Sequence, residues 1–255
     1  MNSMRIDLNS DLGESYGRYT LGMDGEVLRH ITSANIACGF HAGDPLVMEN
    51  TIKAAVENGV SIGAHPGFPD LNGFGRRKMF MSPQELRACI LYQVGALKSM
   101  VEACGGSLNH VKPHGSMYNM AAKDYEMALV IAKAVKDIDD SLILVGLAGS
   151  MLVKAANDEG LPSAGEAFAD RAYDNDGFLI PRSVDGSVIH DENVVVDRVV
   201  SMIKKGSIKS FYGKEIKLEA ETICIHGDTK EALIFAERLR KELSAKGIRI
   251  QPLGK

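Results

Sequence analysis

The chain has 255 residues, a length that fits one large α/β domain or two small ones. Its formal net charge is −4 and its composition is close to the globular average, so charge gives no reason to expect nucleic acid or an anionic membrane as partner. No apolar run approaches the roughly 18 residues of a membrane span, and the N-terminus lacks the apolar segment of a signal peptide. These features predict a cytoplasmic protein that contacts no membrane.

Short β-rich segments alternate along the chain with longer helical patterns, which predicts parallel βαβ units. The expected strands cover 4–9, 33–37, 60–65, 108–112, 142–146, 164–169 and 222–226, and an edge strand is expected near 248–252. The expected helices cover 44–58, 82–104, 124–137, 150–158, 191–204 and 229–245. Two helices have clear start signals, because Asp44 precedes a proline and Ser82 has a glutamate three residues later.

The expected strands have two different faces. In the first strand, Ile6 and Leu8 alternate with Asp7 and Asn9, and other strands alternate in the same way between apolar and small or polar side chains. Strands of an open sheet covered by helices on both faces are apolar throughout. The alternation therefore predicts a closed, distorted (β/α) barrel of seven strands, a single domain over 1–255, with helices outside and a polar mouth.

Polar side chains follow the strands at the expected mouth, where the active sites of (β/α) barrels lie. Four histidines come just after four different strands: His41, His65, His114 and His226. Three histidines and a carboxylate suit Zn²⁺ or a similar ion, so these four are candidate metal ligands. No pair has the close spacing of H-E-x-x-H, and acid–base work by neutral histidines paired with Asp11 or Asp228 is the alternative.

Two arginines follow flexible glycines in the segment Gly73 to Arg77. Arg76 and Arg77 are predicted to hold a carboxylate or phosphate through paired guanidinium bonds, and a surface turn with an exposed ion pair is the alternative. The sequence contains no G-x-x-x-x-G-K-[ST] phosphate loop.

Seven motifs spread over essentially the whole chain: Ile6–Glu14, Thr32–Asp44, Gly63–Pro66, Gly73–Arg77, Lys112–Gly115, Phe168–Arg171 and Cys224–Asp228. Together they resemble the LamB/YcsF family. The resemblance implies a distorted seven-stranded barrel similar to those of glycoside hydrolases and polysaccharide deacetylases. It also implies the A component of an ATP-dependent 5-oxoprolinase, which acts with subunits B and C and opens 5-oxo-L-proline to L-glutamate while ATP, bound with Mg²⁺, is hydrolysed to ADP and phosphate.

On this hypothesis the polar residues of the mouth divide into two groups. The residues expected to activate water, hold an ion or stabilise negative charge are Asp11, His41, His65, Lys112, His114 and His226. The residues expected to contact the substrate are Asp7, Asn9, Glu14, Asn35, Arg76, Arg77, Glu166, Asp170, Arg171 and Asp228.

Two other functions remain open at this point. The first is a metal-dependent deacetylase or amidohydrolase that works without ATP, supported by the histidines and the barrel. The second is a non-catalytic subunit that binds the substrate and delivers it to partner catalysts.

Overall fold

The computed structural model describes residues 4–225 and 230–254. The strands are β1 (Arg5–Leu12), β2 (Ser33–Ala37), β3 (Ser61–His65), β4 (Leu108–Val111), β5 (Ile143–Leu147), β6 (Ser163–Phe168), β7 (Ser207–Lys209), β8 (Glu215–Lys217), β9 (Thr222–Cys224) and β10 (Arg249–Ile250). The α-helices are α1 (Asp24–Val27), α2 (Pro45–Glu57), α3 (Pro83–Ala103), α4 (Gly115–Ala121), α5 (Tyr125–Ile138), α6 (Met151–Asp158), α7 (Glu192–Lys205) and α8 (Lys230–Ala245). A 3₁₀ turn, η1 (Leu71–Gly73), lies between β3 and α3.

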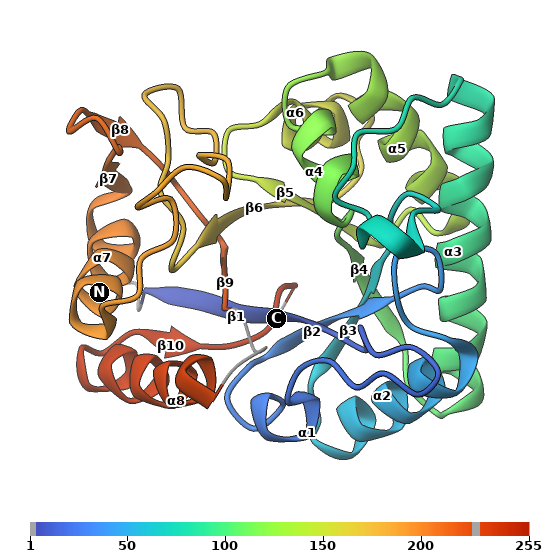
Figure 1. The fold of residues 1–255 in the computed structure, drawn as a ribbon, viewed down its shortest axis with the longest axis horizontal. Helices are drawn as coiled ribbons and strands as arrows, with labels where there is room; N and C mark the ends of the chain where they lie inside the picture. Colours follow the sequence, from blue (N-terminus) through green and yellow to red (C-terminus); the bar gives the residue numbers. More distant parts are fainter. Residues whose placement is uncertain (1–3, 226–229, 255) are drawn as a thin grey trace.

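Seven parallel strands close into a barrel in the order β1-β2-β3-β4-β5-β6-β9. The ring closes because β9 pairs with β6 on one side and with β1 on the other. The short β10 also pairs with β1, at its first two residues. Figure 1 shows the strands in the middle of the molecule with the helices around them. The predicted closed barrel of seven strands is therefore confirmed.

The barrel is irregular between β3 and β4, where the register shifts at Gly63. A Cβ atom on Gly63 would lie 2.1 Å from Nε2 of His110, so only glycine lets the two strands approach with that imidazole between them. The distortion therefore has a local steric cause.

The outward side chains of the strands pack on the helices in two main hydrophobic clusters. One includes Ile36, Ile90 and Ile131 and joins α2, α3 and α5 to the early strands. The other includes Leu8 and Leu239 and joins α7 and α8 to β1, β6 and β9. Since these side chains alternate with inward polar ones, one strand pattern serves both the core and the barrel interior.

The helix starts follow the signals in the sequence. The Asp44 side chain accepts the amides of Leu46 and Val47, and the following proline occupies the first turn of α2. Ser82 and Glu85 form the reciprocal bonds of a capping box at the start of α3.

Several elements differ from the prediction. The first strand continues to Leu12, which carries its polar face further into the mouth. Helices α1 and α4 and the antiparallel hairpin of β7 and β8 were not expected. Each hairpin strand has three residues and buries one isoleucine, too short a pattern to predict. Among the described residues, no helix is long and apolar enough to cross a membrane.

Candidate active site

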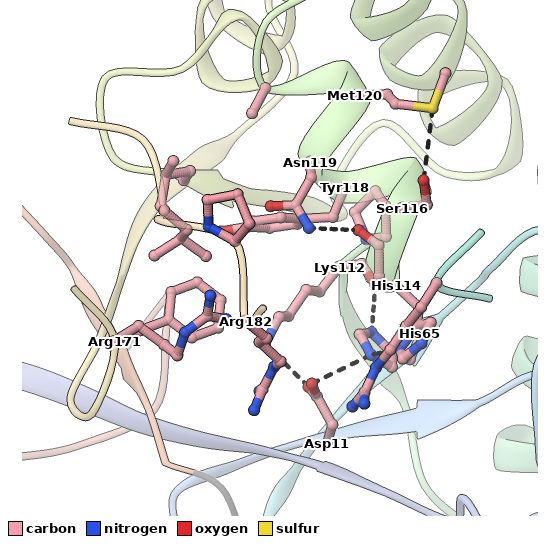
Figure 2. A pocket seen from close by; sticks show the side chains of 18 of the residues that line it. Asp11, His65, Lys112, His114, Ser116, Tyr118, Asn119, Met120, Arg171 and Arg182 are labelled. Carbon is pink, nitrogen blue, oxygen red and sulfur yellow. Dashed lines mark hydrogen bonds and ion pairs between the residues drawn. The ribbon is translucent and has the colours of Figure 1, made fainter. Parts of the chain in front are cut away.

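A cavity of about 680 Å³ opens at the carboxyl ends of the strands. Loops that follow β1, β3, β4 and β6 supply its walls (Figure 2). Its polar lining includes Asp11, Glu14, His65, Arg76, Lys112, His114, Arg171 and Arg182. The apolar lining includes Leu147, Phe168, Phe178 and Ile180. The cavity thus combines acidic, basic and apolar surfaces at the mouth of the barrel.

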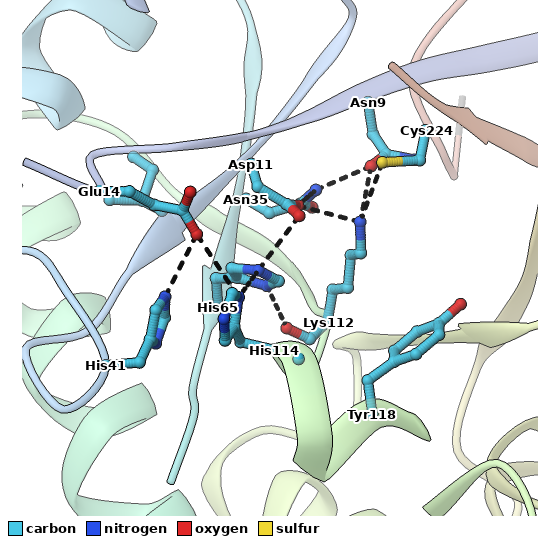
Figure 3. Close-up of polar contacts among 12 residues, drawn as sticks. Asn9, Asp11, Glu14, Asn35, His41, His65, Lys112, His114, Tyr118 and Cys224 are labelled. Carbon is cyan, nitrogen blue, oxygen red and sulfur yellow. Dashed lines mark hydrogen bonds and ion pairs between the residues drawn. The ribbon is translucent and has the colours of Figure 1, made fainter. Parts of the chain in front are cut away.

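Glu14, His41, His65 and His114 form what we call the histidine cluster. They follow or end β1, β2, β3 and β4, so four separate strands bring them together (Figure 3). Each offers one ligand atom, and these four atoms lie within 4.8 Å of one another. The rings of His41 and His114 stack at 3.7 Å between centroids.

In two histidines of this cluster, one ring nitrogen forms a hydrogen bond with a backbone carbonyl. Nδ1 of His65 lies 2.6 Å from the Lys112 carbonyl, and Nε2 of His114 lies 2.8 Å from the Phe74 carbonyl. A carbonyl only accepts, so these two nitrogens carry the protons of the neutral rings. The remaining lone pairs, on His65 Nε2 and His114 Nδ1, then face each other at 3.0 Å. That arrangement calls for a proton or a cation between them.

His41 is fully buried, and neither of its ring nitrogens has a hydrogen-bond partner within residues 4–225 and 230–254. Its Nε2 lies 3.4 Å from Oε1 of Glu14, an oxygen that also has no hydrogen bond there. Burial and the neighbouring His65 hold the pKa of His41 well below its usual range. Burial and the nearby His41 do the same for the pKa of His114. Neutral imidazoles beside a carboxylate fit a divalent cation such as Zn²⁺.

Asn9, Asp11, Lys112 and Glu166 form a second group, the lysine cluster. Nζ of Lys112 lies 2.9 Å from Asp11, 2.7 Å from Glu166 and 3.2 Å from the Asn9 amide oxygen. Burial favours loss of the Lys112 proton, but Asp11, the Cys224 thiol and Glu166 outweigh it and raise the pKa of Lys112 well above its usual range. Lys112 therefore remains a cation although its side chain is only 2 % exposed.

Asp11 connects the two clusters. Its Oδ1 accepts hydrogen bonds from Lys112 and from the Asn35 amide, and its Oδ2 lies 3.3 Å from Nε2 of His65 (Figure 3). Burial alone would raise the pKa of Asp11, but the neighbouring His65 and the Lys112 cation reverse the effect and hold it well below its usual range. Asp11 is thus a carboxylate on the cavity wall, next to both clusters.

Some residues expected to contact the substrate lie deeper in the barrel. Asp7 is buried and accepts hydrogen bonds from Thr32, Ser33 and Thr222, and it does not line the cavity. Burial raises the pKa of Asp7 despite these bonds. Asn9 and Asn35 are likewise buried and bond to each other at 2.8 Å between amide groups. These residues stabilise the interior beneath the cavity.

The two neighbouring arginines point to different places. Arg76 lines the cavity, whereas Arg77 does not and pairs with Asp70 through its guanidinium group. The Arg77 side chain is 68 % exposed. The structure therefore places Arg76 but not Arg77 at the cavity, because the second guanidinium pairs with Asp70.

Other predicted residues are distributed as follows. Arg171 lines the cavity and Glu166 lies within the lysine cluster, while Asp170 is not among the lining residues. His226 and Asp228 lie outside the described residues.

Sequence reasoning missed Tyr118, whose hydroxyl donates to Glu166 at 2.7 Å and which lines the cavity. Burial and the Glu166 charge raise the pKa of Tyr118 well above its usual range, so this phenol keeps its proton. Tyr118 lies four residues after His114, a spacing that places two side chains on the same face of a helix. This spacing could have indicated Tyr118 only if the helix α4 had been predicted.

The closed barrel and the polar mouth define a (β/α)-barrel protein with acidic, basic and imidazole side chains gathered at one end. The sequence pattern of the LamB/YcsF family matches residues 6–255, and the chain belongs to this family. The A component of the 5-oxoprolinase of Alkaliphilus metalliredigens is 54 % identical over 246 residues, which are 96 % of each chain.

Two solved structures extend this comparison. The lactam utilization protein from Thermus thermophilus is 44 % identical and has a TM-score of 0.92, with 97 % of this chain and 99 % of that chain covered. A family 4 carbohydrate esterase from Streptomyces lividans, 12 % identical, has a TM-score of 0.52 and covers 98 % of this chain and 93 % of its own. The second likeness concerns the fold alone.

Proposed function

We propose that the chain is the A component of an ATP-dependent 5-oxoprolinase, which opens 5-oxo-L-proline to L-glutamate. The observation that carries this proposal is the full-length similarity to a protein of that name, together with a mouth whose groups suit amide hydrolysis. Opening a stable lactam needs an activated water, groups that stabilise the oxyanion, and a group that binds the substrate carboxylate. The cavity offers a group for each task.

The histidine cluster is the part of the site that would hold a divalent cation. Its three imidazoles and the Glu14 carboxylate would be the ligands. When bound, such an ion polarises a carbonyl and lowers the pKa of a water molecule. The Asp11 carboxylate, 3.3 Å from His65, would orient the attacking water by accepting its hydrogen bond.

The lysine cluster supplies positive charge on the other side of Asp11. The Lys112 ammonium group would stabilise the negative charge that develops on the lactam oxygen. Its charge is secured by Asp11 and Glu166, so no proton has to be taken up when that charge appears.

The substrate carboxylate would be bound by the arginines of the cavity wall. Arg76 and Arg171 both line the cavity, and a guanidinium group binds a carboxylate through two parallel hydrogen bonds. The apolar wall at Leu147 and Phe168 would contact the methylene groups of the ring.

ATP coupling would involve partner subunits B and C. The nucleotide, with its Mg²⁺, would be bound within the assembled enzyme. We propose that the assembled enzyme works in the cytoplasm.

A second candidate is a metal-dependent amidohydrolase that needs no ATP. The observation in its favour is the histidine cluster, which resembles a zinc ligand set in residue type.

The test is reconstitution of the chain with candidate B and C subunits, with glutamate and phosphate both measured. We expect glutamate and phosphate in equal amounts, lost when this chain is omitted or carries His114→Asn, and kept with Arg77→Ala. Full turnover without this chain would refute the proposal. Hydrolysis by the chain alone without ATP would favour the amidohydrolase.

A further inference from the structure

Phe74 has an unusual backbone conformation beside the histidine cluster. Its φ is 53° and its ψ is 38°, and it is the one non-glycine residue with positive φ in the described part of the chain. A bulky aromatic residue rarely adopts this left-handed conformation, because its side chain crowds the backbone. Such strained positions persist only where the surroundings hold them, and they gather at functional sites.

Hydrogen bonds on both sides of Phe74 stabilise this conformation. The Asp70 side chain accepts the Gly73 amide at 3.0 Å, and the Asp70 carbonyl accepts the Gly75 amide at 2.9 Å. Arg77 pairs with the same Asp70 carboxylate. Asp70 therefore fixes the turn that contains Phe74, and Arg77, predicted to bind an anion, contacts that turn only through Asp70.

Both the carbonyl and the ring of Phe74 contact the histidine cluster. The carbonyl accepts the Nε2 proton of His114 at 2.8 Å, which leaves Nδ1 of that ring as a lone pair directed at the cluster. The Phe74 ring lies edge-on to the stacked rings of His41 and His114, with centroids 5.7 and 5.2 Å away. The Arg76 guanidinium lies over the Phe74 ring at 4.9 Å.

Gly75 allows this close approach. A Cβ atom there would lie 2.8 Å from Cδ2 of His114 and 2.8 Å from Cβ of His41. The Gly75 carbonyl accepts the Ser116 amide at 2.9 Å, which fixes the loop to the first turn of α4, next to His114. The loop and the two imidazoles are therefore one packed unit.

We propose that Phe74 is a positioning residue whose left-handed backbone selects the Nε2–H tautomer of His114, while its ring holds His41 and His114 in stack. The inference rests on the proposed function, because it assigns the purpose of that lone pair to the cation site proposed there. Groups that orient metal-binding histidines typically change metal affinity 10–100-fold when they are altered.

The test separates the backbone of Phe74 from its ring. Phe74→Asn removes the ring but tolerates positive φ, whereas Phe74→Val introduces a β-branched side chain that opposes it. Phe80→Val is the matched control, since Phe80 is 90 % exposed a few residues later. Nitrogen-15 NMR of labelled histidines in the metal-free full-length protein reports the tautomer, with the His114 signal assigned by its loss in His114→Asn. Zn²⁺ affinity is then measured against a competing chelator.

We expect the Nε2–H tautomer of His114 in wild type, Phe74→Asn and Phe80→Val, and a mixture of tautomers in Phe74→Val. Zn²⁺ affinity should fall by about 10–100-fold in Phe74→Val, by less than about tenfold in Phe74→Asn, and not in Phe80→Val. If Phe74→Val does not fold, Phe74→Ala replaces it under the same criterion.

A folded Phe74→Val with an unchanged His114 tautomer would overturn the inference, as would loss of the tautomer in Phe74→Asn. If the wild type binds no Zn²⁺, the proposed cation site fails, while the tautomer measurement still decides the role of Phe74.

Discussion

The histidine cluster and the lysine cluster lie side by side at the barrel mouth, yet their charges are balanced differently. The lysine cluster contains its own cation, because Lys112 contacts Asp11 and Glu166 at 2.9 and 2.7 Å. The histidine cluster has none: within the described residues, the lone pairs of its imidazoles and the Glu14 oxygen converge without a donor between them. A buried group of acceptors is costly unless a cation or proton joins it.

The difference shows which cluster has its charges balanced without a bound ion. The lysine cluster is stabilised by contacts within the chain, so its removal should damage the fold. The histidine cluster is arranged for something the chain does not supply, so its removal should damage binding. The following predictions test that contrast.

The largest effect is expected from Lys112→Met. The substitution leaves the carboxylates of Asp11 and Glu166 buried without their cation, and breaking a buried pair in this way costs about 3–5 kcal/mol. Urea unfolding measures the loss. Lys123→Met, at an exposed lysine whose Nζ lies 4.2 Å from the Phe178 ring centroid, should cost at most about 1 kcal/mol. Equal stability of the two variants would show that the contacts of the lysine cluster do not stabilise the fold.

Glu14→Gln should behave in the opposite way. Without metal it removes a carboxylate whose Oε1 accepts no hydrogen bond within the described residues, so stability should change by less than about 1 kcal/mol. With Zn²⁺ at about 100 times its Kd, wild type should gain about 2.7 kcal/mol and the variant much less. Thermal unfolding with Zn²⁺ and with EDTA measures both, and Glu49→Gln, an exposed residue paired with Lys53, serves as control. The same Zn²⁺ gain in Glu14→Gln would remove this residue from the cation site.

A smaller effect is expected when the arginine of the cavity wall, Arg76, is replaced. Arg76→Ala should raise the KM for 5-oxoproline by about 10–100-fold, the value of a charged hydrogen bond. Arg77→Ala should change it by less than about threefold, because Arg77 does not line the cavity. Steady-state kinetics of the reconstituted enzyme compares the two, and a larger effect at Arg77 would restore the predicted clamp.

The mildest test uses cysteines as probes. Burial raises the pKa of Cys38 to about 12 and that of Cys89 to about 11, so their thiolates are scarce at pH 8. Cys224, beside Lys112, is also buried, and only Cys104 is partly exposed. We expect one alkylated thiol per native chain by mass spectrometry at pH 8, and Cys224 should stay unreactive in Lys112→Met, because loss of the ammonium group raises the pKa of this buried thiol further. Reaction of Cys38 in the wild type would contradict the packing beside the histidine cluster.

The strands and the composition of the mouth followed from the sequence because alternation and strand order determine them. Ile6 and Asp7 had to face opposite sides of a strand, and parallel strands bring their carboxyl ends together. His41, His65 and His114 meet for that reason alone.

Side-chain pairing within the loops did not follow. Arg76 and Arg77 are identical in type and adjacent in sequence. Only Arg77 pairs with the carboxylate of Asp70, seven residues earlier, and this pairing keeps it away from the cavity. Likewise, the depth of Asp7 beneath the cavity depends on hydroxyls from Thr32 and Thr222, which are distant in the chain. Such pairings depend on the finished backbone, which local patterns do not specify.

The ring of strands closes on its first member through the chain's last third. Asp7 receives a hydrogen bond from Thr222, 215 residues later, and the start of β1 pairs with β10 later still. During synthesis, one edge of β1 and one edge of β6 therefore lack their partner strand until β9 has been made. Nascent chains released before β9 emerges should be prone to aggregate through these edges.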